Sequence, residues 1–215
     1  MSSLLHVQEL HVALGGERIL HGVSFESGPG VLGIWGANGS GKSTLLKTIA
    51  GIVQPLDGSV AIAGADLMKE PVKARQHLGY MPEHADLYPH LTCRELAETV
   101  TALRGAASDV WLEWLTPLGL QGMEDVRLGT MSAGQQRKVT LILALCGEPT
   151  LLLLDEPTKA LDEASREFLK EVIQKKRERS LIVITSHLKE YLQTHCTHFL
   201  RMKDGRNEAL ETELR

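Results

Sequence analysis

The chain has 215 residues, 43% of them hydrophobic and 23% charged, with a formal net charge of −4 at pH 7. This length suffices to bury one sizeable core, and the slight acidity argues against a broad basic surface for nucleic acid. No apolar run reaches the roughly 20 residues that span a bilayer, so any membrane role is expected to come through a partner chain.

The first residues and the cysteines favour a protein of the cytosol. Residues 1–6 lack the basic region and the apolar stretch of a secretory signal. The cysteines are scattered and odd in number, so we expect reduced thiols at Cys93, Cys146 and Cys196.

The N-terminal third alternates between short strands and turns. The apolar run 31–35 favours a buried strand, and residues 45–50 favour the first turns of a helix. Strands are expected over residues 4–14, 19–25, 31–35 and 59–63. We therefore expect an antiparallel sheet beside a parallel core.

A glycine-rich segment lies between that buried strand and that helix. Its residues are Gly36, Ala37, Asn38, Gly39, Ser40, Gly41, Lys42, Ser43 and Thr44. Glycines lack a Cβ atom, so the backbone can turn tightly and its N–H groups can converge on phosphate oxygens. Lys42 can reach the β- and γ-phosphates, and the Ser43 hydroxyl is placed for Mg²⁺. Strand, glycine-rich turn and helix together predict a phosphate-binding loop.

The pattern then changes from strand to helix. A strand over 78–83 is cut by Pro82, and Thr92 is the expected N-cap of a helix over 94–104. A second helix is expected over 110–118. The expected organisation is one α/β domain with a mainly parallel sheet, divided into a nucleotide-binding core with a β subdomain (1–82 and 131–215) and a helical subdomain (83–130).

The C-terminal part predicts a buried strand that ends in two acids. Ser132 is expected to cap a helix to about residue 146, and the leucine run 151–154 suits a central parallel strand. Further elements are expected as a helix over 163–179, a strand over 181–185 that leads to His187, and a turn at Asp204 and Gly205.

Asp155 and Glu156 follow the leucine run directly. Ligands of open α/β sheets bind at this end of the strands. Asp155 can hold Mg²⁺ opposite Ser43, usually through water, and Glu156 can orient the attacking water and accept its proton. The acid pair therefore predicts hydrolysis of the bound nucleotide.

Three segments in this order, 36–44, 131–136 and 151–157, resemble the nucleotide-binding subunit of ATP-binding cassette (ABC) transporters. The resemblance covers nearly the whole chain. It implies that Lys42, Ser43 and Thr44 contact phosphate and Mg²⁺, that Asp155 is the Mg²⁺-associated acid and that Glu156 is the general base. His187 matches the switch histidine that contacts the γ-phosphate.

The resemblance also implies partners. Two cassettes, identical or different, would face head to tail, and the signature residues Ser132, Gly134 and Gln135 of one would cap the γ-phosphate of ATP on the other's Lys42. The loop 160–162 would cross this interface. Separate transmembrane permease subunits would be driven through the helical subdomain, with the cassette cytoplasmic and peripheral on the inner face of the membrane.

Three positions depart from the family pattern. Leu14 stands where an aromatic residue usually stacks on adenine, so weak stacking is expected. Ala133 replaces the first signature glycine, a variant that also occurs in the family's haem-export branch of cytochrome c maturation. Glu83 replaces the glutamine that senses Mg²⁺ and meets the membrane subunit, as in exporter-type cassettes.

Two other functions stay open. A non-transport ABC-type ATPase acting on ribosomes or DNA usually carries two cassettes or a long coiled-coil insertion, and this chain has neither. A GTPase is suggested by Thr158 and Lys159, which begin a guanine-reading motif, but Leu161 stands where its aspartate belongs. The transported substrate is not encoded in this chain.

Overall fold

The computed structural model describes residues 3–84, 86–106, 109–208 and 210–212. Residues 1 and 2, which belong to the segment 1–6 assessed for a secretory signal, lie outside them. The strands are β1 (Leu5–Leu14), β2 (Glu17–Ser27), β3 (Gly30–Trp35), β4 (Asp57–Ile62), β5 (Ala65–Asp66), β6 (Leu78–Met81), β7 (Leu151–Asp155), β8 (Leu181–Thr185), β9 (His198–Lys203) and β10 (Arg206–Asn207). The α-helices are α1 (Lys42–Ile49), α2 (Pro71–Gln76), α3 (Cys93–Leu103), α4 (Ala133–Leu145), α5 (Glu163–Lys176) and α6 (Lys189–His195). Two 3-10 helices are η1 (Val110–Trp114) and η2 (Leu128–Thr130).

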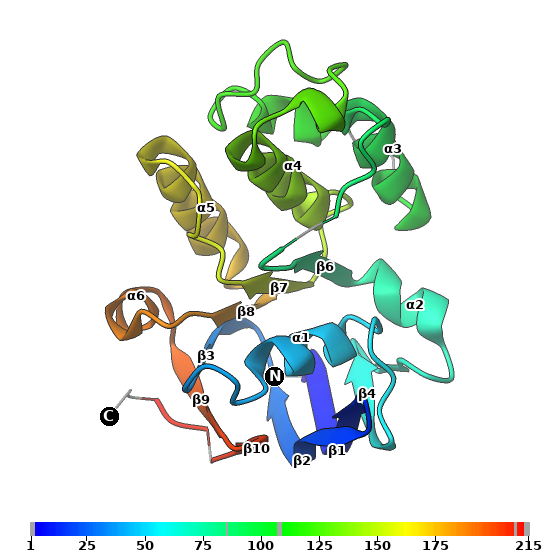
Figure 1. Ribbon diagram of the computed structural model, residues 1–215, viewed down its shortest axis with the longest axis vertical. Coiled ribbons are helices and arrows are strands. Elements are labelled where there is room, and N and C mark those ends of the chain that lie inside the picture. Colours follow the sequence, from blue (N-terminus) through cyan, green and yellow to red (C-terminus); the bar gives the residue numbers. More distant parts are fainter. Residues whose placement is uncertain (1–2, 85, 107–108, 209, 213–215) are drawn as a thin grey trace.

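The strands form two sheets (Figure 1). The smaller sheet has the order β2-β1-β4-β5 and is antiparallel. The larger has the order β10-β9-β3-β8-β7-β6, and all neighbours from β9 to β6 are parallel. The expected α/β class, with a mainly parallel sheet and an antiparallel β subdomain, is confirmed.

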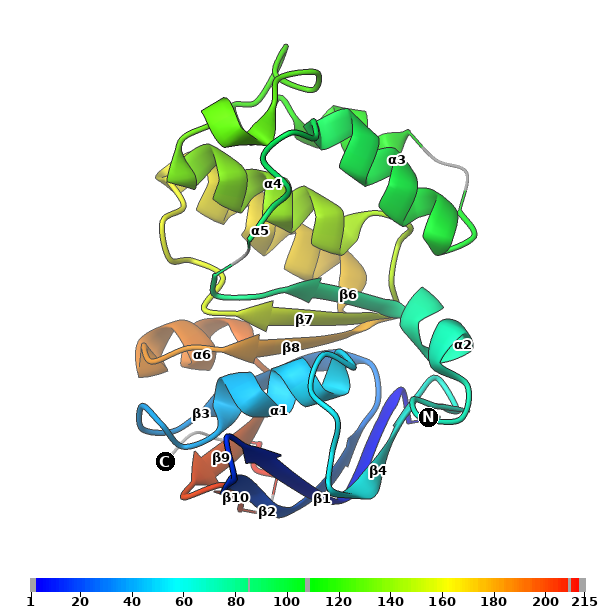
Figure 2. The ribbon, with the colours of Figure 1, turned by 45° about the vertical axis from the view of Figure 1, so that its right-hand side comes forward.

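Helices cover both faces of the parallel sheet. Figure 2 shows α1 between the parallel strands and the antiparallel sheet, with α3, α4 and α5 on the opposite face. Side chains alternate along β3, so Val31 joins the core under the helices, and Leu32 and Ile34 join the core around α1. The sheet therefore separates two cores, and its strands are buried on both sides.

The contact between β6 and α4 requires a glycine. A Cβ atom at Gly79 would lie 2.0 Å from the carbonyl oxygen of Ala144. This close approach packs the start of β6 against the C-terminal end of α4.

The expected caps of α3 and α4 are confirmed. Thr92 accepts a hydrogen bond from the backbone N–H of Glu95, whose carboxylate accepts one from the N–H of Thr92. Ser132 and Gln135 make the same reciprocal pair at the start of α4. Both helices begin where the sequence predicts because the capping side chains act locally.

The expected helix over 110–118 is wrong in type and length. Only η1 forms there, and turns follow it. Pro117 disfavours a helical conformation at the preceding residue, and Gly119 adopts a positive φ of 64°. The sequence also did not predict α2, α6, β9 or β10. None of the helices in the described segments is long and apolar enough to cross a membrane.

Candidate active site

The glycine-rich loop 36–44 connects β3 to α1 at the carboxyl end of the parallel strands. Gly39 and Gly41 have φ angles of 80° and 99°, which favour glycine. A Cβ atom at Gly36 would lie 2.1 Å from the carbonyl oxygen of Met202. The loop is therefore a tight turn that leads into a helix N-terminus, whose free N–H groups suit an anion.

Lys42 folds back over this loop. Its Nζ donates hydrogen bonds to the carbonyl oxygens of Gly36 (2.8 Å) and Ala37 (3.0 Å). Burial lowers the pKa of Lys42, and the charges of Glu156, Asp155 and Glu83 oppose this shift. The ammonium thus lies across the loop that would hold the phosphates, within electrostatic range of three carboxylates.

Ser43 and Asp155 meet although 112 positions separate them. The Ser43 hydroxyl donates to Asp155 Oδ1 at 3.3 Å, and the Thr185 hydroxyl donates to the same oxygen at 2.5 Å. Hydroxyl and carboxylate oxygens are ligands that Mg²⁺ accepts, so this donor set fits the ion. Thr185 is a fully buried residue that the sequence did not single out.

Glu156 and His187 form a pair. His187 Nδ1 lies 2.9 Å from Glu156 Oε2. The backbone N–H of Glu156 donates to the Thr185 hydroxyl (3.1 Å) and carbonyl (3.2 Å), and Glu156 adopts a φ of 47°, uncommon outside glycine. The end of β8 therefore holds Glu156 in an unusual conformation with its carboxylate beside an imidazole.

Arg137 ties α4 to this acid pair. The residue is 7% exposed, and its guanidinium donates to the carbonyl oxygens of Asp155 (3.0 Å) and Glu156 (2.9 Å). It also donates to the carbonyls of Pro82 and Glu83, the latter at 3.0 Å. Nothing in the sequence distinguishes this arginine from the neighbouring Lys138, so sequence reasoning missed it.

The signature residues lie apart from the loop of their own chain. Within the described residues, Ser132 and Gln135 hydrogen-bond to one another, and the Gln135 side-chain amide also donates to the Met123 sulfur. Gly134 lies beside the loop 160–162, because a Cβ atom there would be 3.7 Å from the carbonyl oxygen of Ala160. A role for these residues at a nucleotide held by another copy stays a prediction.

Leu14 ends β1 and is 43% exposed. The hairpin it belongs to borders the phosphate loop, since a Cβ atom at Gly41 would lie 2.7 Å from Leu20 of β2. A side chain at position 14 can therefore approach a base bound beside the loop.

Replacing Leu14 by tyrosine is expected to tighten ATP binding about fivefold, because stacking a base on an aromatic ring contributes about 1–3 kcal/mol. The measurement is titration with a fluorescent ATP analogue, repeated in competition with GTP. Leu56→Tyr, at another exposed leucine, is the control and should leave affinity unchanged. If the protein without substitutions binds GTP more tightly than ATP, a GTPase function would be favoured.

A phosphate loop after β3, an acid pair after β7 and a histidine after β8 define a P-loop nucleoside triphosphatase. Residues 20–159 match a protein family described as "ABC transporter". The chain therefore belongs to the ABC transporter family, as an ATP-binding cassette, the ATP-hydrolysing part of such transporters.

Curated relatives agree with this assignment. An uncharacterised ABC transporter ATP-binding protein of Bacillus subtilis, YybJ, is 33% identical over 87% of this chain and 86% of its own length. The Nod factor export ATP-binding protein I of Burkholderia pseudomallei is 32% identical over 89% of this chain and 65% of its own. The rat ATP-binding cassette sub-family A member 7 is 35% identical over 83% of this chain, which spans only 8% of that protein.

Solved structures share the fold. The ATP-binding subunit of an ABC transporter superposes with a TM-score of 0.89 at 28% identity, over 97% of this chain and 90% of the other. A dimeric cassette in a post-hydrolysis state, bound to ADP and Pi, gives a TM-score of 0.83 at 26% identity, over 97% and 98%. The haem-export resemblance of the signature stays a prediction.

Proposed function

We propose that this chain powers export through separate membrane subunits, and that ATP closes two cassettes head to tail around two nucleotides. The contact series Ser43–Asp155–Thr185–Glu156–His187 carries the proposal, since it joins the phosphate loop to a base candidate. Export as the direction is supported by the name of the Nod factor export relative.

Each residue would have one task. The N–H groups of the loop 36–44 and the Lys42 ammonium would bind the triphosphate. Mg²⁺, held by Ser43 and Asp155, would offset phosphate charge when bound. Glu156 would accept the proton of the attacking water, while His187 would orient the Glu156 carboxylate and contact the γ-phosphate.

A second cassette would complete each site. Ser132 is exposed and Gly134 half-buried at the start of α4, where the helix N-terminus favours an anion. The partner's signature residues, including Gln135, would approach the γ-phosphate held by Lys42. The dimeric cassette among the solved structures supports this arrangement, and either a homodimer or a heterodimer would satisfy it.

The membrane subunit would dock between the core and the helical subdomain 83–130. A groove of about 570 Å³ opens there, between α2, β6, α3 and α4. Its exposed apolar side chains are Ile52 (63%), Val72 (72%) and Leu103 (72%). Such a patch suits the apolar face of a helix from the cytoplasmic side of a permease. The cassette would therefore be peripheral on the inner face of the membrane.

Replacing Leu103 by glutamate is expected to abolish recovery of the membrane subunit with the tagged protein from detergent-solubilised membranes, because a charge would enter the apolar groove. ATP hydrolysis by the purified protein should persist. Leu56→Glu is the matched control: it alters another exposed leucine (60%, against 72% for Leu103) outside the groove and should leave recovery intact. If ribosomes are recovered with the tagged protein, and neither substitution changes that recovery, a transport role would be contradicted.

A further inference from the structure

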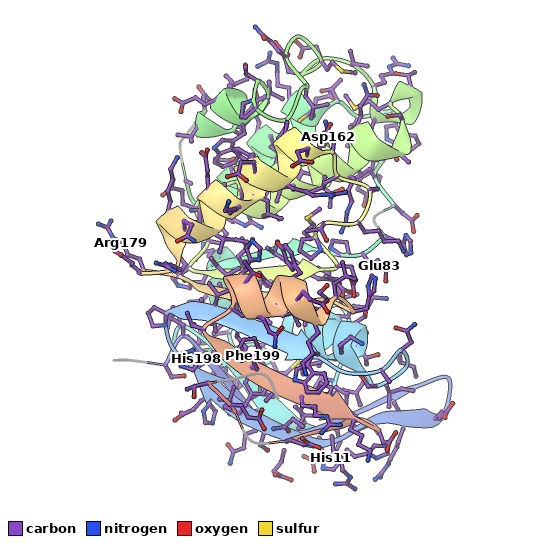
Figure 3. All side chains as sticks on the ribbon, turned by 90° about the vertical axis from the view of Figure 1, so that its left-hand side faces the viewer. His11, Glu83, Asp162, Arg179, His198 and Phe199 are labelled. Carbon is purple, nitrogen blue, oxygen red and sulfur yellow. The ribbon has the colours of Figure 1, made fainter. Side chains whose placement is uncertain are left out.

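An ion pair joins two loops at the edge of the candidate active site. Lys159 Nζ lies 2.6 Å from Glu83 Oε1. Glu83 follows β6, and Lys159 lies in the turn after β7, so 76 positions separate the partners. Figure 3 shows Glu83 at the level of the central sheet, below the helical layer that carries Asp162.

Lys159 is fixed to the turn that carries Glu156. Its backbone N–H donates to the Glu156 carbonyl at 3.2 Å, and Arg137 donates to the carbonyls of both Glu83 and Glu156. The Arg137 side chain thus connects the backbones of the two loops. The Glu83 and Lys159 side chains are 31% and 52% exposed, so the ion pair itself can open without unfolding the loops.

Lys159 is the main partner of the Glu83 carboxylate. The hydrogen bond from Lys159 is the leading cause that lowers the pKa of Glu83, with smaller contributions from the charges of Lys159, His84 and Arg137. His84 Nε2 is 3.6 Å from the same oxygen, but its ring is mostly exposed. Removing Lys159 would therefore release this carboxylate from its nearest cation.

The charge of Glu83 reaches the nucleotide site. Together with Glu156 and Asp155, it raises the pKa of Lys42 against the effect of burial. A divalent cation beside Ser43 and Asp155 would attract a third carboxylate, and a carboxylate is a stronger Mg²⁺ ligand than an amide. Arg137 donates to the backbone carbonyls of both Glu83 and Asp155, so the loop of Glu83 lies beside the acid pair. Glu83 would therefore have two competing cations: Lys159 in the structure, and Mg²⁺ once nucleotide is bound.

We propose that Lys159 is a positioning residue that competes with Mg²⁺ for Glu83, and that it holds this carboxylate away from the metal until the magnesium–nucleotide complex occupies the site. This inference rests on the proposed function, since it requires that nucleotide and Mg²⁺ bind at the loop 36–44. It explains how the chain accommodates a third acid: Lys159 supplies the compensating charge.

The test is the Mg²⁺ concentration at half-maximal binding of a fluorescent ATP analogue, a readout of binding and not of turnover. Lys159→Met is expected to lower this midpoint about two- to fivefold, the range for an exposed ion pair. Lys159→Arg keeps the positive charge and should give the same Mg²⁺ midpoint as the protein without substitutions. In the Glu83→Gln background, Lys159→Met should have no effect.

Lys170→Met is the matched control, because it removes a comparable pair with Glu167 on α5, 3.1 Å in length. A midpoint that stays the same or rises in Lys159→Met overturns the inference. So does an equal shift in the Glu83→Gln background, which would mark a general charge effect. Failure of the unchanged protein to bind nucleotide would instead defeat the proposed function itself.

Discussion

Replacing Glu156 by glutamine is expected to slow ATP hydrolysis about 10²–10⁴-fold, the usual contribution of a positioned general base. The amide has the shape of the carboxylate but cannot accept the proton of the attacking water. His187 lies 2.9 Å from Glu156 and can still hydrogen-bond to the amide, so the local geometry should persist. Nucleotide affinity should change little, because Lys42 and the loop 36–44 are untouched.

Phosphate release measures the turnover, and size-exclusion chromatography with and without MgATP measures association. We expect the Glu156→Gln protein to form a dimer only with MgATP, since the nucleotide joins two copies that cannot hydrolyse it. Glu163→Gln is the control, at an exposed acid in the first turn of α5. Normal turnover in Glu156→Gln would show that another group is the base.

The parts of the site that the sequence predicted depend on short segments. The turn 36–44 and its helix are specified by consecutive residues, and β7 and β8 by unbroken apolar runs. The cap at Ser132 is equally local. Parallel order then brings the ends of β7 and β8 together, so Asp155 contacts Ser43 of the loop and His187 lies beside Glu156. Contact of His187 with the γ-phosphate stays a prediction.

The parts that the sequence did not predict depend on distant neighbours. In the sequence, Thr185 is simply the last residue of an apolar strand. Only the register of β7 and β8 places it opposite Asp155. Lys159 meets Glu83 only because β6 and β7 are adjacent. The strand β9 was missed because His198 and Arg201 interrupt its apolar pattern.

The contacts of Arg137 also join residues that are far apart in the sequence. Replacing this side chain is the second change expected to have a large effect. Arg137→Leu should destabilise the protein by about 3 kcal/mol, since several hydrogen bonds from a buried cation are lost, each worth about 1.5–3 kcal/mol. For a chain of this size the melting temperature should fall by about 6–12 °C. ATP hydrolysis should fall as well, because Asp155 and Glu156 lose the donor to their carbonyls.

Arg137→Lys separates the two effects. A lysine keeps the charge, but its single ammonium cannot serve the carbonyls of both the loop after β6 and the turn after β7, as the planar guanidinium does. We therefore expect Arg137→Lys to recover part of the stability in urea unfolding and little of the ATPase rate. Arg166→Leu, which removes one part-buried bond from an exposed arginine to the Leu161 carbonyl, is the control and should cost less than about 1 kcal/mol. If Arg137→Lys hydrolyses ATP at the unchanged rate, the charge alone suffices, and the guanidinium does not hold the two loops in the geometry that hydrolysis needs.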